Sequence, residues 1–220
     1  MRVEEIFKGV FKIDGKLATR NLVRGNTVYG ERLLEENGRE YRMWDPYRSK
    51  LSAAIMKGMQ KMAIGEGSKV LYLGAATGTT CSHVSDIVGD KGELYAVELS
   101  ERNARELVKM SERRTNILPI MQDARNTEAY AADVGEVDVL YQDVAARDQD
   151  FILLKNAELL KGKGFAYVAI KSQSIDVGRN PKEIYKEFLT EISKEFDVLE
   201  QIDIKPYDDA HLFVVLRKKA

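Results

Sequence analysis

The most constraining feature of the sequence is a regular alternation, from residue 69 onward, of short apolar runs with segments of helical spacing. Near-continuous apolar runs are typical of parallel strands covered on both faces, and the helical segments between them supply the crossover connections. The pattern therefore predicts a doubly wound α/β sheet. The expected strands are residues 69–74, 94–98, 117–121, 137–143 and 165–171, and the expected helices are residues 79–89, 101–114, about 148–160 and 181–195.

Two further apolar runs close the chain. Residues 196–204 and 211–217 are joined by KPYDDA, which leaves no room for a crossover helix. They predict an antiparallel hairpin. With the five preceding strands, this hairpin gives a mostly parallel, Rossmann-like sheet of seven strands.

The first 50 residues have a different character. Turn pairs such as Asp14-Gly15 and Asn37-Gly38 separate short runs, which predicts a small β-hairpin subdomain over residues 1–50 and leaves 51–220 for the Rossmann-like domain. From Ser49 onward the spacing is helical. The apolar residues expected on this entry helix are Leu51, Ala54, Ile55, Met59 and Met62.

Charge and cysteine content exclude several classes of protein. The 34 Lys+Arg nearly balance the 35 Asp+Glu, for a net charge of -1, whereas an autonomous nucleic-acid binder usually carries a basic excess. One cysteine and two histidines cannot build a disulfide or a typical zinc site, so we expect no metal centre. No apolar run approaches the roughly 18 residues of a membrane helix, and the N-terminus lacks a signal pattern, so we expect an intracellular protein without a membrane partner.

The segment LYLGAATGTTCSH follows the first expected parallel strand and leads into a helix. The small residues Gly74, Ala75 and Gly78 would let a ligand approach the backbone amides. Their spacing is not the G-x-G-x-x-G of dinucleotide-binding enzymes, and the lysine of a P-loop is missing. An ordinary strand-to-helix turn remains an alternative interpretation of this loop.

Carboxylates follow three of the expected strands. Glu98 ends the second strand, where it could accept the ribose hydroxyls of a nucleoside, and Asp123 follows the third, where it could bond an adenine amino group. Asp143 ends the fourth. Each alone could be a helix cap or loop residue, but three such acids at the carboxyl ends of neighbouring strands favour S-adenosyl-L-methionine as the cofactor.

Missing residues narrow the class of methyl acceptor. Methylation of a DNA amino group needs an Asn/Asp-Pro-Pro-aromatic segment after the fourth strand, where the sequence reads DVAA. Methylation of a pyrimidine carbon needs a nucleophilic cysteine there, yet the single cysteine, Cys81, lies at the glycine loop and is more simply a small buried residue. A magnesium-dependent catechol enzyme needs an acid after the fifth strand, where Lys171 stands.

Lys171 and Asp143 suit a ribose 2′-hydroxyl as the acceptor. An ammonium group beside an orienting carboxylate can stabilise a developing alkoxide or assist removal of its proton. Lys50, at the head of the entry helix, would bring a second positive charge, and His211, at the start of the last strand, could reach the same place. The lysines could instead be surface residues, and His83, in the helix after the glycine loop, is more often structural than chemical.

Long stretches of the chain resemble fibrillarin, the family of ribose 2′-O-methyltransferases of box C/D guide-RNA particles. The sequence resembles the archaeal members of this family in particular, because no Gly/Arg-rich tail precedes the core. The resemblance covers almost the whole chain and is carried by NLVRGNTVYGE, YRMWDPYRSKLSAAI, LGAATGTTCSHVSDIVG, LYAVELS, RRTNILPIMQDAR, VDVLYQDVA, IKSQSID and DDAH.

The resemblance implies a catalytic set of Lys50, Asp143, Lys171 and His211. With the loop residues, the expected cofactor contacts are Gly74, Ala75, Thr79, Thr80, Glu98, Leu99, Asp123, Ala124, Asp143, Val144, Ala145 and Ala146. The chain departs from the family at Ala146, where a glutamine is usual. A backbone contact to the cofactor would survive that change, whereas a side-chain contact would not.

The resemblance also implies a Nop-family scaffold protein, a kink-turn-binding protein of ribosomal type, and a box C/D guide RNA that selects target nucleotides of rRNA or tRNA, in the archaeal cytoplasm. Residues 1–50 hold 11 Lys+Arg, among them Arg42 and Arg48, against 8 Asp+Glu. That surplus is too small for independent binding, because such binders engage about 6–10 phosphates. A small-molecule O-methyltransferase and a non-catalytic ribonucleoprotein subunit are the alternative functions.

Overall fold

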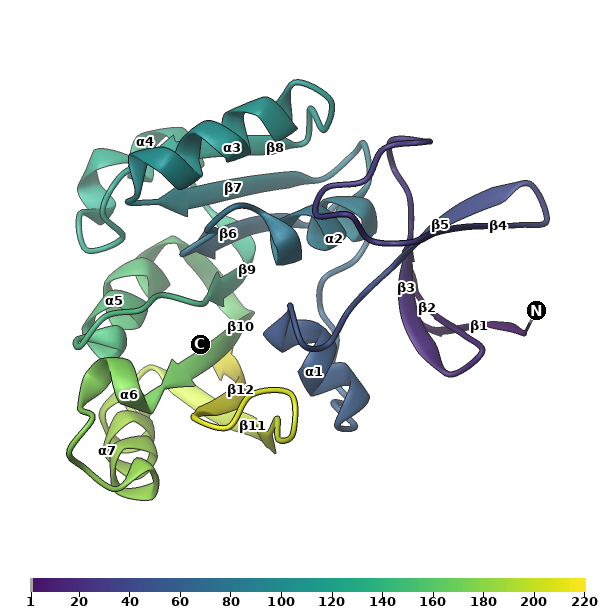
Figure 1. Cartoon of the computed structure of the whole chain (residues 1–220). Coiled ribbons are helices and arrows are strands. Elements are labelled where there is room, and N and C mark those ends of the chain that lie inside the picture. Colours follow the sequence, from purple (N-terminus) through teal and green to yellow (C-terminus); the bar gives the residue numbers. More distant parts are fainter. Residues whose placement is uncertain (1) are drawn as a thin grey trace.

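The computed structural model describes residues 2–220 and contains two sheets, a small one formed by the N-terminal strands and a large one flanked by helices (Figure 1). Within residues 2–220, no helix combines the length and the apolar character needed to cross a membrane. The strands are β1 (Val3–Phe7), β2 (Val10–Ile13), β3 (Lys16–Arg20), β4 (Leu33–Glu36), β5 (Arg39–Met43), β6 (Lys69–Leu73), β7 (Glu93–Glu98), β8 (Ile117–Met121), β9 (Val137–Gln142), β10 (Leu160–Lys171), β11 (Phe196–Asp203) and β12 (His211–Lys218). The helices are α1 (Lys50–Met56), α2 (Thr79–Val88), α3 (Glu101–Ser111), α4 (Ala131–Val134), α5 (Gln149–Asn156), α6 (Ser172–Ile175) and α7 (Pro181–Ile192), with 3-10 turns at Thr127–Ala129 and Ala157–Leu159.

The large sheet has seven strands in the order β11-β12-β10-β9-β6-β7-β8. Strands β10, β9, β6, β7 and β8 are parallel, and β12 pairs antiparallel with both β10 and β11. The predicted Rossmann-like sheet with an antiparallel C-terminal hairpin is therefore confirmed. The order reverses between β6 and β9, and a ligand crevice is expected at such a switch point.

Alternate residues of the parallel strands feed two separate cores. Val70 and Tyr72 of β6 pack in the core that also contains residues of α1, α2 and α3. Leu71 and Leu73 face the opposite core, which contains residues of α4, α5 and α7. Both faces of the sheet are thus covered, which explains why its strands are near-continuous apolar runs.

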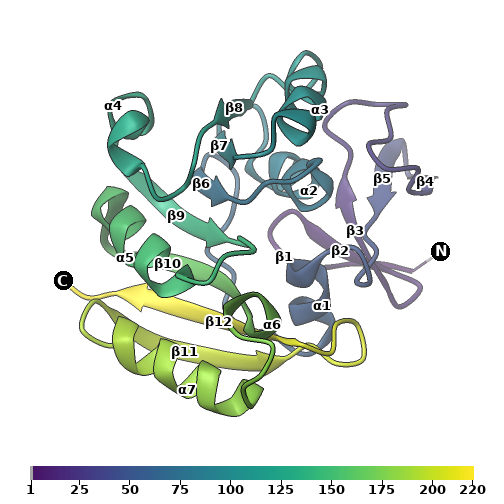
Figure 2. The same ribbon diagram turned by 60° about the vertical axis from the view of Figure 1, so that its left-hand side comes forward.

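The small sheet has the order β1-β2-β3-β5-β4, and all its pairs are antiparallel. It does not stand apart from the rest of the chain, because Val10, Leu17 and Trp44 belong to the same core as α1 and α2. Figure 2 shows β3 and β5 lying beside α2. The N-terminal β-strands predicted from the turn signals are confirmed as this sheet.

A buried cluster of charged side chains joins the small sheet to the large unit. Arg42 of β5 and Arg114, which follows α3, both contact the carboxylate of Asp86 in α2, at 2.9 and 2.6 Å. Glu31 accepts a hydrogen bond of 2.6 Å from Nε of Arg42. Arg42, counted in the basic surplus of residues 1–50, is fully buried, because two carboxylates neutralise the two guanidinium groups in the interior.

His83 and Cys81 have structural surroundings. Nδ1 of His83 lies 2.7 Å from the Thr19 hydroxyl and Nε2 lies 2.7 Å from the Tyr29 hydroxyl, while the ring stacks on Trp44. Cys81 is fully buried in the core shared by α1 and α2, and burial raises the pKa of its thiol. Both residues match the structural interpretation of the sequence.

Several element ends differ from the expected ones. The entry helix ends at Met56, because Gly58 takes φ +94°, and Met59 joins the core from beyond the helix. The helix expected at 148–160 stops at Asn156 and is followed by a 3-10 turn, since Leu160 already pairs with Val137 as the start of β10. Likewise α3 and α7 end three residues earlier than expected, and the one-turn helices α4 and α6 were not predicted.

Candidate active site

A cavity of about 520 Å³ opens at the carboxyl ends of the parallel strands. Nine of the twelve predicted cofactor residues line it: Gly74, Glu98, Leu99, Asp123, Ala124, Asp143, Val144, Ala145 and Ala146. The predicted residues Ala75, Thr79 and Thr80 do not line this cavity. Lys171 does, so the cavity and the predicted catalytic group meet at one edge of the sheet.

The glycine loop is held close to the end of β9. Gly74 has φ +78°, and a Cβ atom at this position would lie 2.8 Å from the carbonyl oxygen of Asp143. The loop is also tied to β7, since the amides of Gly74 and Ala75 donate to the carbonyl of Val97 at 2.9 and 3.1 Å. Only glycine satisfies both the backbone conformation and the close approach.

Glu98 forms the floor of the cavity next to this loop. One carboxylate oxygen accepts the amide of Ala76 at 2.8 Å, and the other accepts the amide of Ser100 at 2.8 Å and the side-chain amide of Asn103 at 3.5 Å. A carboxylate offers about four acceptor positions, so two incoming hydroxyls would have to replace one of these donors. Asn103 makes the longest bond and is the donor we expect a ribose to replace.

The remaining wall of the cavity is both polar and apolar. Leu99 is 63% exposed and offers an apolar surface suited to a nucleobase. Asp123 accepts the backbone amide of Arg125 at 2.9 Å, and the Arg125 guanidinium also binds Asp148 at 2.7 and 2.6 Å. The hydrogen bond to Asp148 is the main reason that the pKa of Arg125 is raised.

Lys50, Asp143 and Lys171 come together although they are far apart in the sequence. Oδ1 of Asp143 lies 3.2 Å from Nζ of Lys50 and 2.8 Å from Nζ of Lys171. Nζ of Lys171 also donates to the backbone carbonyl of Asp143 at 2.7 Å. The side chains are largely buried, so one carboxylate balances two ammonium groups in a site of reduced solvent screening.

His211 lies opposite Lys171 in the β10–β12 register. Its Nδ1 contacts Oδ1 of Asp208, and burial lowers the pKa of the ring although the Asp208 hydrogen bond opposes that shift. A neutral ring has one N–H, and the carboxylate can only accept it, which leaves Nε2 as an acceptor. Lys50 and Asp143 also act electrostatically on His211, so all four predicted catalytic residues lie in one neighbourhood.

Thr80 makes a contact that the sequence did not predict. Its hydroxyl donates to the Ser49 hydroxyl at 3.0 Å, and both side chains are buried. Ser49 caps α1, whose first residue is Lys50. Thr80 therefore ties the start of α2 to the helix that carries a predicted catalytic lysine.

Some cavity residues were not predicted: Ala76, Val97, Ser100, Asn103, Gln122, Arg125 and Ile152. For Ala76, Ser100 and Arg125 the available signal is position, because each lies within two residues of a predicted contact. Ile152 of α5 has no such signal, since it reaches the cavity only through packing of the helix. Among residues 2–220, no group of three or more His, Cys, Asp or Glu side chains is arranged to hold a metal ion.

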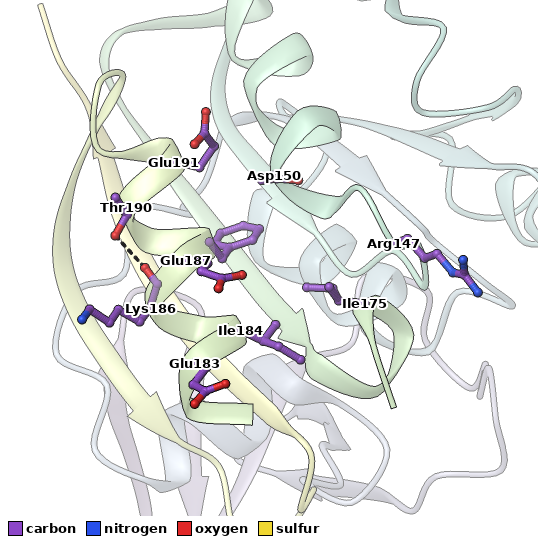
Figure 3. A pocket seen from close by; sticks show the side chains of 10 residues that line it. Arg147, Asp150, Ile175, Glu183, Ile184, Lys186, Glu187, Thr190 and Glu191 are labelled. Atoms are coloured by element: carbon purple, nitrogen blue, oxygen red, sulfur yellow. Dashed lines mark hydrogen bonds between the residues drawn. The ribbon is translucent and has the colours of Figure 1, made fainter. Parts of the chain in front are cut away.

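A different cavity, of about 610 Å³, lies between α7 and the segment around α5 and α6 (Figure 3). Its labelled side chains include Glu183, Glu187 and Glu191 of α7, with Asp150 and Arg147 on the segment that faces them. Glu187 is paired with Arg179 at 2.9 Å. None of the predicted site residues lines this acidic cavity, and it contributes no group to the cluster at Asp143.

The Rossmann-like sheet, its glycine loop, and the carboxylates around the cavity at its switch point define an S-adenosylmethionine-dependent methyltransferase. The family model described as Fibrillarin matches residues 1–220. The chain belongs to the fibrillarin family.

Named relatives agree with this membership. The chain is 49% identical over 218 residues to the fibrillarin-like rRNA/tRNA 2′-O-methyltransferase of Pyrococcus furiosus, covering 96% of each chain. It superposes on Aeropyrum pernix fibrillarin in complex with natively bound S-adenosyl-L-methionine with a TM-score of 0.91 and 40% identity, covering 98% of both chains. With a fibrillarin/Nop5p complex the TM-score is 0.90 at 37% identity, covering 98% of this chain and 100% of the other.

Proposed function

We propose that this protein is an S-adenosylmethionine-dependent RNA methyltransferase that modifies the 2′-hydroxyl of ribose in rRNA and tRNA. The observation that carries the proposal is the meeting of Lys50, Lys171 and Asp143 at the edge of the cofactor cavity. Related proteins of the family are named for this reaction, and one has been solved with the cofactor bound.

The cavity fits the cofactor by its own chemistry. Gly74 keeps the loop backbone close to Asp143, Glu98 and Asp123 present acceptors, and Leu99 offers an apolar surface. When bound, S-adenosylmethionine supplies an electrophilic methyl group. Glu98 would bind the ribose of the cofactor, and Asp123 with Leu99 would bind and orient its base.

The two lysines would act on the oxygen of the acceptor. A ribose 2′-hydroxyl is a weak nucleophile, and its oxygen becomes more negative as its proton leaves. Ammonium groups of Lys50 and Lys171, held together by Asp143, are preorganised to stabilise that charge. Because the cluster is largely buried, their effect is stronger than it would be in water.

His211 would accept the proton of the hydroxyl. Its ring is neutral near pH 7 because burial lowers its pKa, and Asp208 holds the hydrogen at Nδ1. Nε2 is then the free acceptor. In this assignment His211 moves the proton, whereas the lysines stabilise charge and do not need to lose their own protons.

A Nop-family protein is the partner of this family. We propose further that a kink-turn-binding protein and a box C/D guide RNA complete the particle in the archaeal cytoplasm, and that guide pairing selects the target nucleotide. The net charge of -1 supports delivery of the RNA by others, since independent RNA binding relies on many cationic contacts.

Transfer of a labelled methyl group from S-adenosylmethionine tests the function. We expect label at the 2′-oxygen of the guide-paired nucleotide when scaffold, kink-turn protein and guide are all present, and little label when any one is omitted. A free catechol serves as the small-molecule acceptor. Methylation of catechol without guide RNA, together with inactivity of the complete particle, would contradict the proposal.

A further inference from the structure

A cavity of about 600 Å³ adjoins the segment that leads into α1. Four aromatic side chains line it, namely Tyr29, Trp44, Tyr47 and Tyr207. None of them belongs to the cofactor cavity or to the cluster at Asp143. This third cavity, which we call the aromatic cavity, has no part in the chemistry described above.

The aromatic cavity lies where two segments that carry predicted catalytic residues approach each other. Tyr47 stands three residues before Lys50, and Tyr207 stands four residues before His211. Their rings meet edge to face with centroids 5.1 Å apart, and Figure 2 shows the loop between β11 and β12 passing beside α1. An RNA strand placed with one ribose at Lys50 would therefore have a neighbouring nucleotide within reach of this pair.

The aromatic pair is open to a ligand. Tyr47 is 67% exposed, and within the described residues it is the one tyrosine among the large hydrophobic side chains that face solvent. An edge-to-face contact leaves at least one face of each ring without an aromatic partner. Such faces stack nucleobases without regard to sequence, which suits an enzyme whose targets differ in sequence.

The charge around the aromatic cavity suits a phosphate. Lys16, Arg32 and Arg48 line it, and within residues 2–220 Lys16 and Arg32 form no ion pair. Arg48 lies over the Tyr29 ring at 4.9 Å and donates to the Tyr29 carbonyl at 3.3 Å, so its guanidinium is already positioned. Two carboxylates also line it: Glu31 is neutralised by Arg42, and Asp45 accepts the backbone amide of Tyr47 at 2.9 Å, which leaves the cavity with a surplus of positive charge.

Trp44 forms a fixed part of the wall of the aromatic cavity. Its side chain is 2% exposed, and its indole N–H has no hydrogen-bond partner among the described residues. Stacking on His83, with centroids 4.8 Å apart, fixes the ring at the wall of the aromatic cavity.

We propose that the aromatic cavity binds one nucleotide of the RNA substrate that flanks the methylated one. The base stacks on Tyr47 and Tyr207, and a phosphate pairs with Arg48. The proposal rests on the RNA-methylating function stated above. RNA is favoured over a protein partner because cationic and aromatic groups alternate here directly beside the residues that would act on ribose.

Trp44 is the only tryptophan of the chain, so its fluorescence reports on this cavity directly. Because the protein alone binds RNA weakly, we expect a short oligouridylate to change the emission saturably only at high oligonucleotide concentration, with an affinity that falls as salt rises. Tyr47→Ala should weaken binding about fivefold or more, as loss of one stacking partner predicts. Phe151→Ala is the control, because Phe151 is a comparably exposed aromatic residue on α5.

Kinetics in the complete particle give the second readout. Tyr47→Ala and Arg48→Gln should raise the KM for guided RNA while the KM for S-adenosylmethionine stays within twofold of wild type. Arg24→Gln, which alters an exposed arginine paired with Glu35, should change neither value. Because Tyr47 is exposed, Tyr47→Ala should fold like wild type, and an unchanged midpoint of unfolding would verify that it does.

Two outcomes overturn the inference. One is oligouridylate binding by Tyr47→Ala that equals wild type, with an unchanged KM for guided RNA. The other is that Tyr47→Ala loses binding to the Nop-family scaffold while its binding to RNA is unchanged, which would assign the cavity to a protein partner. An inactive wild-type particle would overturn the proposed function instead, so the two failures are distinguishable.

Discussion

The imidazole of His211 is held by the carboxylate of Asp208, three residues earlier in the chain. This contact fixes which ring nitrogen carries hydrogen, and it raises the pKa of the ring against the larger lowering caused by burial. If His211 accepts the proton, Asp208→Asn should reduce methyl transfer about tenfold or more. The acid limb of the pH profile should also move to lower pH, because the Asp208 carboxylate that raises the pKa of His211 is gone.

A pH profile of single-turnover methyl transfer measures both effects. Asp209→Asn is the matched control, since Asp209 is the neighbouring exposed acid and should leave rate and profile unchanged. An Asp208→Asn profile that superposes on wild type would show that His211 only packs at the site. Activity that rises only well above pH 7 would instead point to a lysine as the base.

Asp143 should be essential for methyl transfer but not for cofactor binding. Asp143→Asn keeps the shape of the side chain but removes the charge that holds Lys50 and Lys171 together. We expect the rate of transfer to fall about 100-fold or more, while the Kd for S-adenosylmethionine measured by calorimetry changes less than tenfold. The reverse pattern, intact transfer with lost binding, would refute the catalytic assignment.

Asp138→Asn is the control for this variant. Asp138 lies on the same strand, β9, and is paired with Lys161 at 2.7 Å. It lies at the other end of the strand, so its loss should leave both transfer and cofactor binding unchanged.

Gly74→Ala separates a steric effect from a conformational one. The new Cβ would lie 2.8 Å from the Asp143 carbonyl oxygen, so either the loop or the end of β9 must move. Gly25→Ala has a similar φ of +75° but no neighbouring atom within 4 Å. Both variants should lose about 1 kcal/mol of unfolding free energy for the left-handed backbone, and only Gly74→Ala should lose cofactor affinity. Calorimetry with denaturant unfolding checks both, and equal affinities would contradict the steric account.

Stability should fall in mild acid because of His83. Burial and the nearby Arg42 and Arg114 hold the pKa of this ring well below 6.5. Below about pH 6.5 the unfolded chain then binds a proton that the folded chain does not, so the free energy of unfolding decreases as pH falls. The loss from this group should therefore grow as the pH is lowered from about 7 to 5.

Urea unfolding at several pH values measures this dependence. His83→Gln should be less stable than wild type at neutral pH, since the contacts to Thr19 and Tyr29 change. Its stability should nevertheless depend less on pH within this window. A wild-type stability that is flat across the window would show that His83 takes up its proton as readily in the folded protein as in the unfolded chain.

The sheet was predictable because its signal is local. The apolar run at 117–121 coincides with β8, and the strand-end acids Glu98 and Asp143 follow directly from where such runs stop. The antiparallel hairpin followed from a connection too short for a helix. These inferences needed only the period of the side chains and the lengths of the segments.

Features that depend on contacts between distant segments were not predictable in this way. Arginine is usually a surface residue, and Arg42 is paired with Asp86 only because α2 packs against β5. The Thr80 hydroxyl donates to Ser49, which lies 31 positions earlier in the chain. The Tyr47–Tyr207 pair joins residues 160 positions apart, and no local pattern announces such a pairing.

The charged cluster of Arg42, Asp86 and Arg114 bears on how the chain could be divided. A cut before α1 would remove Arg42 and Glu31 together, leaving Asp86 of α2 and Arg114, which follows α3, newly uncovered. It would also strip Trp44 from the ring of His83. The boundary near residue 50 therefore does not separate two independently folding units. A Rossmann-like core excised there would be incompletely folded and would not be a smaller enzyme.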